Sequence, residues 1–230
     1  VIGQLINETY FYNGKAYSMP KHGLARRYPF TVKECAGAKA VFALESNAEM
    51  LEKYPFEFEL VMTFELEDKT LKNSMKVINK NNGEMFFSLG AHPGFNCAVG
   101  DIIEFEKAET IPTERIDSDS LIIDKKFPLL ENSREIEITE EIFKADALIL
   151  SGMQSEKLRI KGENEIEFTF GKCPFLGIWA KPGAPYVCIE PWYGVNDGRE
   201  VKNDISEKRG IQKLGEGETF EYIWSAEVIR

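Results

Sequence analysis

The chain has 230 residues, 43% hydrophobic and 29% charged, so it is long enough for a complete core and too apolar to be a disordered segment. Its 38 acidic and 28 basic side chains give a net charge of −10, which argues against nucleic acid and anionic membrane surfaces as partners. No positively charged segment followed by an apolar run opens the sequence, no apolar run reaches membrane-spanning length, and the four cysteines lack metal-binding or redox spacing. We therefore expect a cytoplasmic protein that forms one domain over residues 1–230.

Short β-type segments predominate along the chain. The clearest covers residues 56–67, where large apolar residues alternate with mostly polar ones, as in a strand with one buried face. Further β-rich runs cover residues 74–79, 85–89, 102–106, 120–123, 135–138, 147–150, 157–160, 165–170, 175–179, 186–190 and 219–229. Strands at such short spacing indicate an all-β sandwich or barrel.

Turns, and not long helices, separate these segments. Asn82-Gly83 favours a type I′ hairpin, and residues 181–185 predict a loop. Brief helical signals cover residues 47–53, 140–144 and 204–210, with Ser46, Thr139 and Asp204 as their respective caps. None of them is long enough to cover a parallel sheet, which disfavours a Rossmann fold or a TIM barrel.

The two histidines of the chain lie in breaks of the β pattern. His22 belongs to the segment PKHGLAR, and His92 belongs to the segment GAHPGFN. A turn rich in glycine and proline fixes the position of an imidazole, and functional side chains are often carried on such loops. A surface histidine that hydrogen-bonds a backbone carbonyl is the simpler alternative for each of them.

Glu190 ends an apolar strand and is followed by Pro191, Trp192 and Tyr193. A partly desolvated carboxylate has a raised pKa, which suits a general base, and neighbouring aromatic rings offer a flat apolar surface to a cyclic ligand. A solvated carboxylate at the strand end is the alternative interpretation.

Three ordered segments carry a resemblance to a known family: HGLAR (residues 22–26), GAHPGFN (90–96) and APYVCIEPW (184–192). Together they resemble the aldose 1-epimerase, or galactose mutarotase-like, family, and most closely its lactose-operon-associated branch. The resemblance extends over nearly the whole chain and implies an all-β supersandwich with a few short helices and a sugar cleft across one face. It also leads us to expect that some N-terminal strands of the family are lacking before Val1, and that Gln4 stands where many members carry an arginine.

The resemblance further implies the role of each site residue. Glu190 matches the general base, His92 the general acid and His22 a second histidine that binds and polarises the sugar. The remaining expected sugar-binding residues are Asp146, which resembles an aspartate that binds sugar hydroxyls, and Arg26, Phe95 and Trp192.

The implied reaction is the interconversion of the α and β anomers of an aldohexose by acid–base ring opening, which needs no cofactor. We expect no metal, although two histidines and a carboxylate are also a known metal-ligand set. We expect a neutral aldohexose as the substrate, with a hexose phosphate as the alternative because Arg26 and Arg27 would create a local positive charge.

Other functions are compatible with the same residues. The protein would be a carbohydrate-binding or sensing protein if it kept the cleft without turnover. It would be a hydrolase or lyase if Asp146 and Glu190 flanked a glycosidic bond, or a structural β domain of a larger sugar-processing enzyme. The sequence determines neither the particular sugar nor the oligomeric state.

Overall fold

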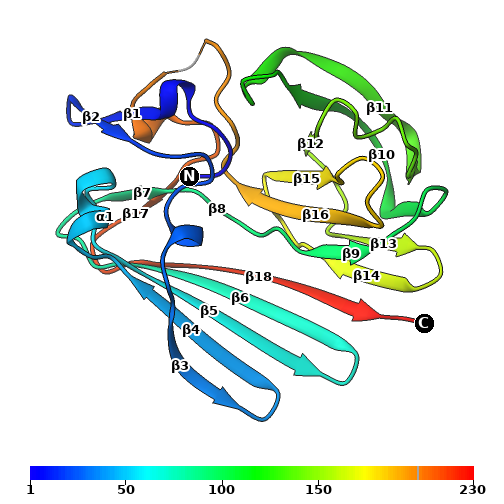
Figure 1. Ribbon diagram of the computed structural model, residues 1–230, viewed down its shortest axis with the longest axis horizontal. Helices are drawn as coiled ribbons and strands as arrows, with labels where there is room; N and C mark the ends of the chain where they lie inside the picture. The colour runs from blue at the N-terminus through cyan, green and yellow to red at the C-terminus, as the bar shows by residue number, and fades with distance from the viewer. Residues whose placement is uncertain (201) are drawn as a thin grey trace.

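The computed structural model describes residues 1–200 and 202–230, most of which form antiparallel β-strands (Figure 1). A 14-stranded sheet folds back on itself around the core. One half of its strand order is β3 (Thr31–Ala36), β4 (Lys39–Glu45), β5 (Phe58–Glu67), β6 (Thr70–Asn79), β18 (Thr219–Val228), β14 (Glu165–Thr169) and β13 (Lys157–Lys161). The order continues with β10 (Ile102–Ile116), β12 (Leu148–Ser151), β15 (Phe175–Trp179), β16 (Tyr186–Tyr193) and β8 (Leu89–Gly90), while β11 (Ile122–Glu137) pairs with β10 and β9 (Gly94–Asn96) with β16.

The remaining elements are small. Two further strand pairs are β1 (Thr9–Tyr12) with β2 (Lys15–Ser18), and β7 (Met85–Phe87) with β17 (Gln212–Leu214). The helical elements are α1 (Ala48–Lys53) and the 3-10 turns η1 (Ile6–Glu8), η2 (Ala25–Arg27) and η3 (Ile205–Glu207). Across residues 1–200 and 202–230, no helix has the length and apolar character needed to cross a bilayer. The prediction of an all-β fold is confirmed.

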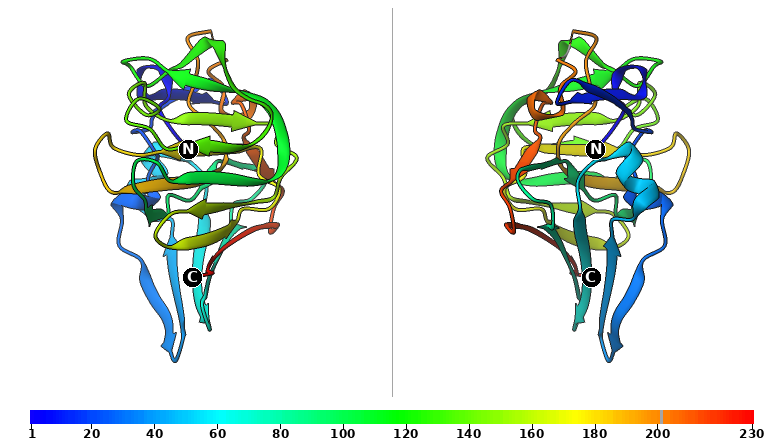
Figure 2. Two further views of the ribbon diagram at one scale, coloured as in Figure 1. Left: turned by 90° about the vertical axis from the view of Figure 1, so that its right-hand side faces the viewer. Right: turned by 90° about the vertical axis from the view of Figure 1, so that its left-hand side faces the viewer.

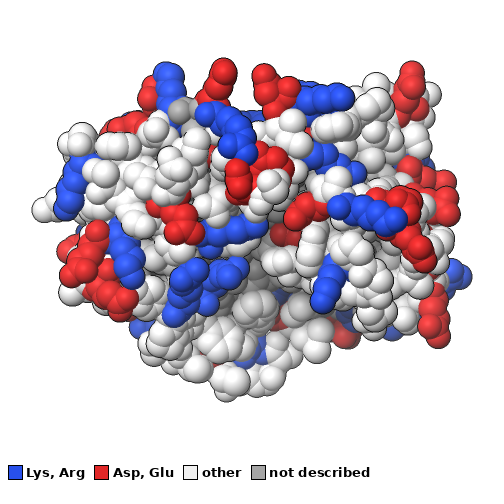
Figure 3. Space-filling view, turned by 45° about the horizontal axis from the view of Figure 1, so that its top comes forward, with Lys and Arg blue, Asp and Glu red and all other residues white. Residues whose placement is uncertain are grey.

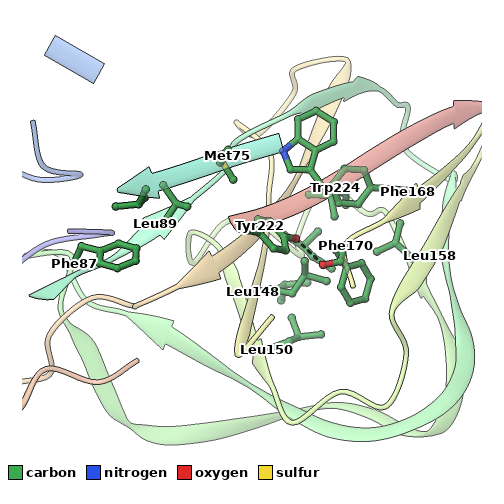
Figure 4. Close-up of a cluster of buried hydrophobic side chains, with 14 of the residues drawn as sticks. Met75, Phe87, Leu89, Leu148, Leu150, Leu158, Phe168, Phe170, Tyr222 and Trp224 are labelled. Carbon is green, nitrogen blue, oxygen red and sulfur yellow. Dashed lines mark hydrogen bonds between the residues drawn. The ribbon is translucent and has the colours of Figure 1, made fainter. Parts of the chain in front are cut away.

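The core forms where side chains of distant strands meet (Figure 4). On β18, Tyr222 and Trp224 are buried while Ile223 between them is exposed, as the two-residue period of a strand requires. The ring of Phe168 on β14 packs at a tilt 5.5 Å from that of Trp224, and the Tyr222 hydroxyl donates a 2.6 Å hydrogen bond to the carbonyl of Phe170. That bond satisfies a buried hydroxyl which would otherwise destabilise the core by roughly 1–3 kcal/mol.

Strands β3, β4, β5 and β6 extend beyond the body of the molecule as long hairpins (Figure 2). The predicted strand at residues 56–67 is present as β5, but its single buried face is incomplete. Leu60 is buried near the body, whereas Leu66 at the far end is 55% exposed because the hairpins leave the core there. Strand β3 forms the outer edge, and all its residues are exposed.

Three predicted turn and cap features differ in the structure. Asn82-Gly83 does not join a hairpin, because β6 pairs with β5 and β18 while β7 pairs with β17. Helix α1 is capped by Asn47, whose Oδ1 accepts a 3.0 Å hydrogen bond from Met50 N, and not by Ser46. Thr139 accepts a hydrogen bond from Ile142 N, but residues 140–145 form only turns.

The third helical signal and the predicted loop are confirmed. Asp204 caps η3 by accepting a hydrogen bond from Ser206 N, and residues 181–185 connect β15 to β16 without regular structure. Each of these features depends on neighbouring residues alone, which explains why local sequence was sufficient.

Candidate functional site

Strand β16 carries Glu190 on the face opposite the main core. Val187 and Ile189 are fully buried in that core, so Cys188 and Glu190, which alternate with them, point to the other face. Glu190 is only 6% exposed, which confirms the expectation that this carboxylate is desolvated.

Trp192 lies beside Glu190 on the same face of β16. It belongs to a small buried cluster with Phe175 and Val195. Gly177 lies opposite Glu190 on β15, and a Cβ atom there would approach the Trp192 ring to 2.4 Å. The lack of a side chain at Gly177 therefore provides the space that the Trp192 ring occupies.

The β8–β9 segment brings His92 to Glu190. The backbone is fixed by the pairing of Gly94 with Cys188 and by a 3.2 Å hydrogen bond from Ile189 N to the carbonyl of Pro93. His92 Nδ1 lies 3.0 Å from Glu190 Oε1. Two residues almost 100 positions apart in the chain thus form an imidazole–carboxylate pair.

The pair favours the charged form of His92. Hydrogen bonds with Cys188 and then Glu190, reinforced by the negative charge of Glu190, raise the pKa of His92 from 6.5 to about 10. His92 is therefore protonated at neutral pH and able to donate a proton.

His22 has the opposite electrostatic environment. Burial and, after it, the positive charges of Lys21, Arg26 and His92 lower its pKa from 6.5 to about 4. The backbone at His22 has φ +63°, and His22 Nδ1 accepts a 3.3 Å hydrogen bond from Gly3 N. At neutral pH this imidazole is uncharged, and its proton lies on Nε2 because Nδ1 is an acceptor.

The comparisons to known proteins identify the family of the chain. The sequence profile of the aldose 1-epimerase family matches residues 4–195 of the chain. The chain belongs to the aldose 1-epimerase family.

Individual members of this family show the same relationship. The LacX proteins of Lactococcus lactis subsp. lactis, plasmid and chromosomal, are each 28% identical over 211 residues, which cover 84% of this chain and 70% of theirs. A galactose mutarotase related enzyme from Lactobacillus acidophilus has a TM-score of 0.93 and 27% identity, covering 100% of this chain and 81% of its own. A galactose mutarotase-like protein from Lactobacillus casei has a TM-score of 0.92 and 25% identity, with coverages of 99% and 82%. These neighbours confirm a galactose mutarotase-like fold for this aldose 1-epimerase family member.

Within residues 1–200 and 202–230, the side-chain hydrogen bonds and ring contacts of the other expected sugar-binding residues do not include His92 or Glu190. Arg26 is exposed on η2, and the ring of Phe95 packs 5.5 Å from that of Phe168. Asp146 is exposed, and its Oδ1 accepts a 2.7 Å hydrogen bond from Ala147 N within its own turn. The binding roles of these three residues, and of the buried Trp192, stay predictions.

Two site residues were missed by the sequence analysis. The Trp179 ring lies 5.9 Å from that of His92 in an edge-on arrangement, and Trp179 pairs with Cys188 across β15 and β16. Both have a signal in the sequence. Trp179 ends a predicted strand. Cys188 precedes Glu190 by two positions, which places the side chains of Cys188 and Glu190 on one face of their strand.

From the sequence, two histidines and a carboxylate were considered as a metal-ligand set. The structure brings together a different set of possible ligands. Ligand atoms of His92, Cys188 and Glu190 lie within 4.8 Å of one another. His22 is not part of this group.

Proposed function

We propose that this chain is an aldose 1-epimerase that interconverts the α and β anomers of an aldohexose, with Glu190 as general base and His92 as general acid. The 3.0 Å contact between His92 Nδ1 and Glu190 Oε1 carries the proposal, because it keeps a proton donor beside a proton acceptor. His92 remains 59% exposed, so a ligand can reach the pair from solvent.

Ring opening uses both groups at once. The Glu190 carboxylate accepts the proton of the anomeric hydroxyl, and the electron pair of that O–H bond forms the carbonyl bond at C1. The bond between C1 and the ring oxygen breaks, and its electron pair takes the proton donated by the His92 imidazolium. The product is an open-chain aldehyde beside a neutral Glu190 and a neutral His92.

Ring closure restores the starting state of the protein. After rotation about the C1–C2 bond, the ring hydroxyl attacks the opposite face of the carbonyl and gives its proton to His92. Glu190 returns its proton to the new anomeric oxygen. No oxidant or reductant is needed, because the hemiacetal and the open-chain aldehyde are at the same oxidation level, and both protons return to the groups that carried them.

His22 and Trp179 would hold the sugar without exchanging protons with it. A neutral His22 donates a hydrogen bond through Nε2 to a sugar oxygen, and its pKa near 4 makes it a poor carrier of a second proton at neutral pH. The half-buried Trp179 beside His92 offers an aromatic surface for the apolar C–H face of a pyranose.

A neutral aldohexose fits the charge of the protein better than a hexose phosphate. The net charge is −10, and basic side chains on the face shown in Figure 3 are interspersed with acidic ones. Lys21 and Arg26 near His22 are the local basic groups that would favour a phosphate. Competition between glucose and glucose 6-phosphate therefore tests the substrate class.

The deciding experiment is anomer exchange measured by NMR in freshly dissolved α-glucose and α-galactose. Glu190→Gln and His92→Asn are each expected to lose roughly 10²–10⁴-fold of the acceleration over buffer. Glu227→Gln, an exposed carboxylate on β18, is the matched control and should retain it.

The outcomes separate the alternatives. A wild-type rate equal to that of buffer would refute turnover of these sugars, and saturable sugar binding in the same sample would then favour a binding or sensing protein. Release of reducing ends from an oligosaccharide would instead favour a hydrolase.

A further inference from the structure

We propose that Cys188, His92 and Glu190 form a binding site for a thiophilic divalent cation of the Zn²⁺ class, and that its occupation blocks the acid–base pair. The cation would be an inhibitor of the site and not a cofactor. Binding itself is independent of the proposed function, whereas the inhibition rests on it.

The donor atoms are the first argument. A thiolate sulfur, a neutral imidazole nitrogen and a carboxylate oxygen are ligand types of Zn²⁺ sites that keep a fourth position open, and binding of the ion releases the protons that the donors carry. Their ligand atoms lie within 4.8 Å of one another. Since Zn–S and Zn–N bonds are about 2.3 and about 2.1 Å, a tetrahedral site needs separations of about 3.5 Å.

The backbone fixes the positions of two of the three donor residues. Cys188 and Glu190 are fixed on one face of β16 by its pairing with β15, and β9 pairs with Cys188 through Gly94. Cys188 is 5% exposed and Glu190 is 6% exposed, while the His92 side chain is 59% exposed. A small shift of the exposed imidazole would therefore bring the three donors around one ion.

Access and selectivity follow from the same arrangement. The cation reaches the site from the side of His92, where a sugar is also expected to bind. Mg²⁺ and Ca²⁺ prefer oxygen ligands and avoid thiolates, so they should not compete at this site.

The binding test uses Co²⁺ as a spectroscopic probe with the protein first freed of metal by a chelator. We expect a thiolate-to-cobalt charge-transfer band that saturates at one ion per chain. The band should be absent from Cys188→Ser and present in Cys35→Ser, which removes the exposed thiol that an adventitious ion would use. Cys188→Ala repeats the test if the serine variant does not fold.

The inhibition test compares anomer exchange with Zn²⁺ and after addition of a chelator. We expect at least tenfold inhibition that the chelator reverses, with no inhibition by Mg²⁺. A band that persists in Cys188→Ser and Cys188→Ala, or that disappears in Cys35→Ser, would overturn the site.

Failure of this proposal can be told apart from failure of the proposed function. If the metal-free protein does not accelerate anomer exchange but shows the Cys188-dependent band on addition of Co²⁺, the proposed epimerase activity is refuted and the metal site is supported. Protein that accelerates exchange without a band and without Zn²⁺ inhibition refutes the metal site alone.

Discussion

His92 Nδ1 and Glu190 Oε1 lie 3.0 Å apart, yet the His92 side chain is 59% exposed and that of Glu190 only 8%. The carboxylate is therefore shielded from water while its partner reaches solvent. The imidazole of His92 is therefore the part of the pair that an incoming ligand can reach.

The first prediction concerns the pH dependence of anomer exchange. His92 must carry a proton to act as the acid, and its pKa is raised from 6.5 to about 10. The enzymatic rate should therefore persist above neutrality and fall only as the pH approaches about 10. Rates measured from about pH 6 to about pH 11, corrected for buffer catalysis, check this. A decline centred near the ordinary histidine pKa would contradict the ion pair.

The second prediction concerns stability in mild acid. The pKa of His22 is 6.5 in the unfolded chain and about 4 in the folded protein, so the unfolded chain binds a proton first as the pH falls. The contribution of His22 to stability is thus complete above pH 6.5 and lost as the pH falls toward 4. Urea unfolding of wild type and His22→Gln should show that the free energy of unfolding falls less with acid in the variant. Equal losses in both proteins would show that His22 has no such linkage.

The third prediction concerns the space beside Glu190. A Cβ atom at Gly177 would lie 2.4 Å from the Trp192 ring, so Gly177→Ala should displace this ring and lower the free energy of unfolding by about 1–3 kcal/mol. The same change should reduce anomer exchange, because Gly177 pairs with Glu190. Gly198→Ala is the control, since its Cβ would meet only the carbonyl of Ile122 at 3.6 Å. Similar costs for both variants would refute the packing argument.

The fourth prediction concerns Trp179. Removing the ring beside His92 in Trp179→Ala should raise KM by roughly tenfold, or about 1.4 kcal/mol of binding, with a smaller effect on kcat. Trp179→Phe keeps an aromatic face and should recover most of the affinity. Unchanged KM in the alanine variant would remove Trp179 from the sugar site.

The fifth prediction concerns the buried ion pair of Lys208 and Asp197. Lys208 Nζ lies 2.6 Å from Asp197 Oδ2, and these side chains are 6% and 3% exposed. Lys208→Ala leaves a buried carboxylate unpaired and should lower the free energy of unfolding by about 3–5 kcal/mol. Lys144→Ala removes an exposed pair with Glu141 and should cost at most about 1 kcal/mol. Chemical denaturation measures both, and equal losses would contradict this contrast.

Local sequence was sufficient for many of the strands from β5 onward and for the types of residue at the candidate site, but no predicted segment covered β1, β2, β3 or β4. The segment from Tyr186 to Glu190 is a short apolar run that ends in a carboxylate, which predicted a buried strand, and the structure places it in β16. The three motifs around His22, His92 and Glu190 identified the family, because their residue types and order are specific in combination.

Strand pairing could not be obtained in this way. Asn82-Gly83 has the composition of a hairpin turn, but the long-range pairing of β7 with β17 determines the path of the chain there. Such pairing depends on which apolar faces become buried together, and the residues in contact are far apart in the sequence.

The sequence by itself identified the family and the candidate residues His22, His92 and Glu190, because their three motifs are specific in combination. Only the tertiary structure decided their charge. The same side chain has a pKa of about 10 at His92, where it meets Cys188 and Glu190, and about 4 at His22, which is desolvated among positive charges. Desolvation and nearby charge act through space, so they exist only once β9 and β16 lie side by side.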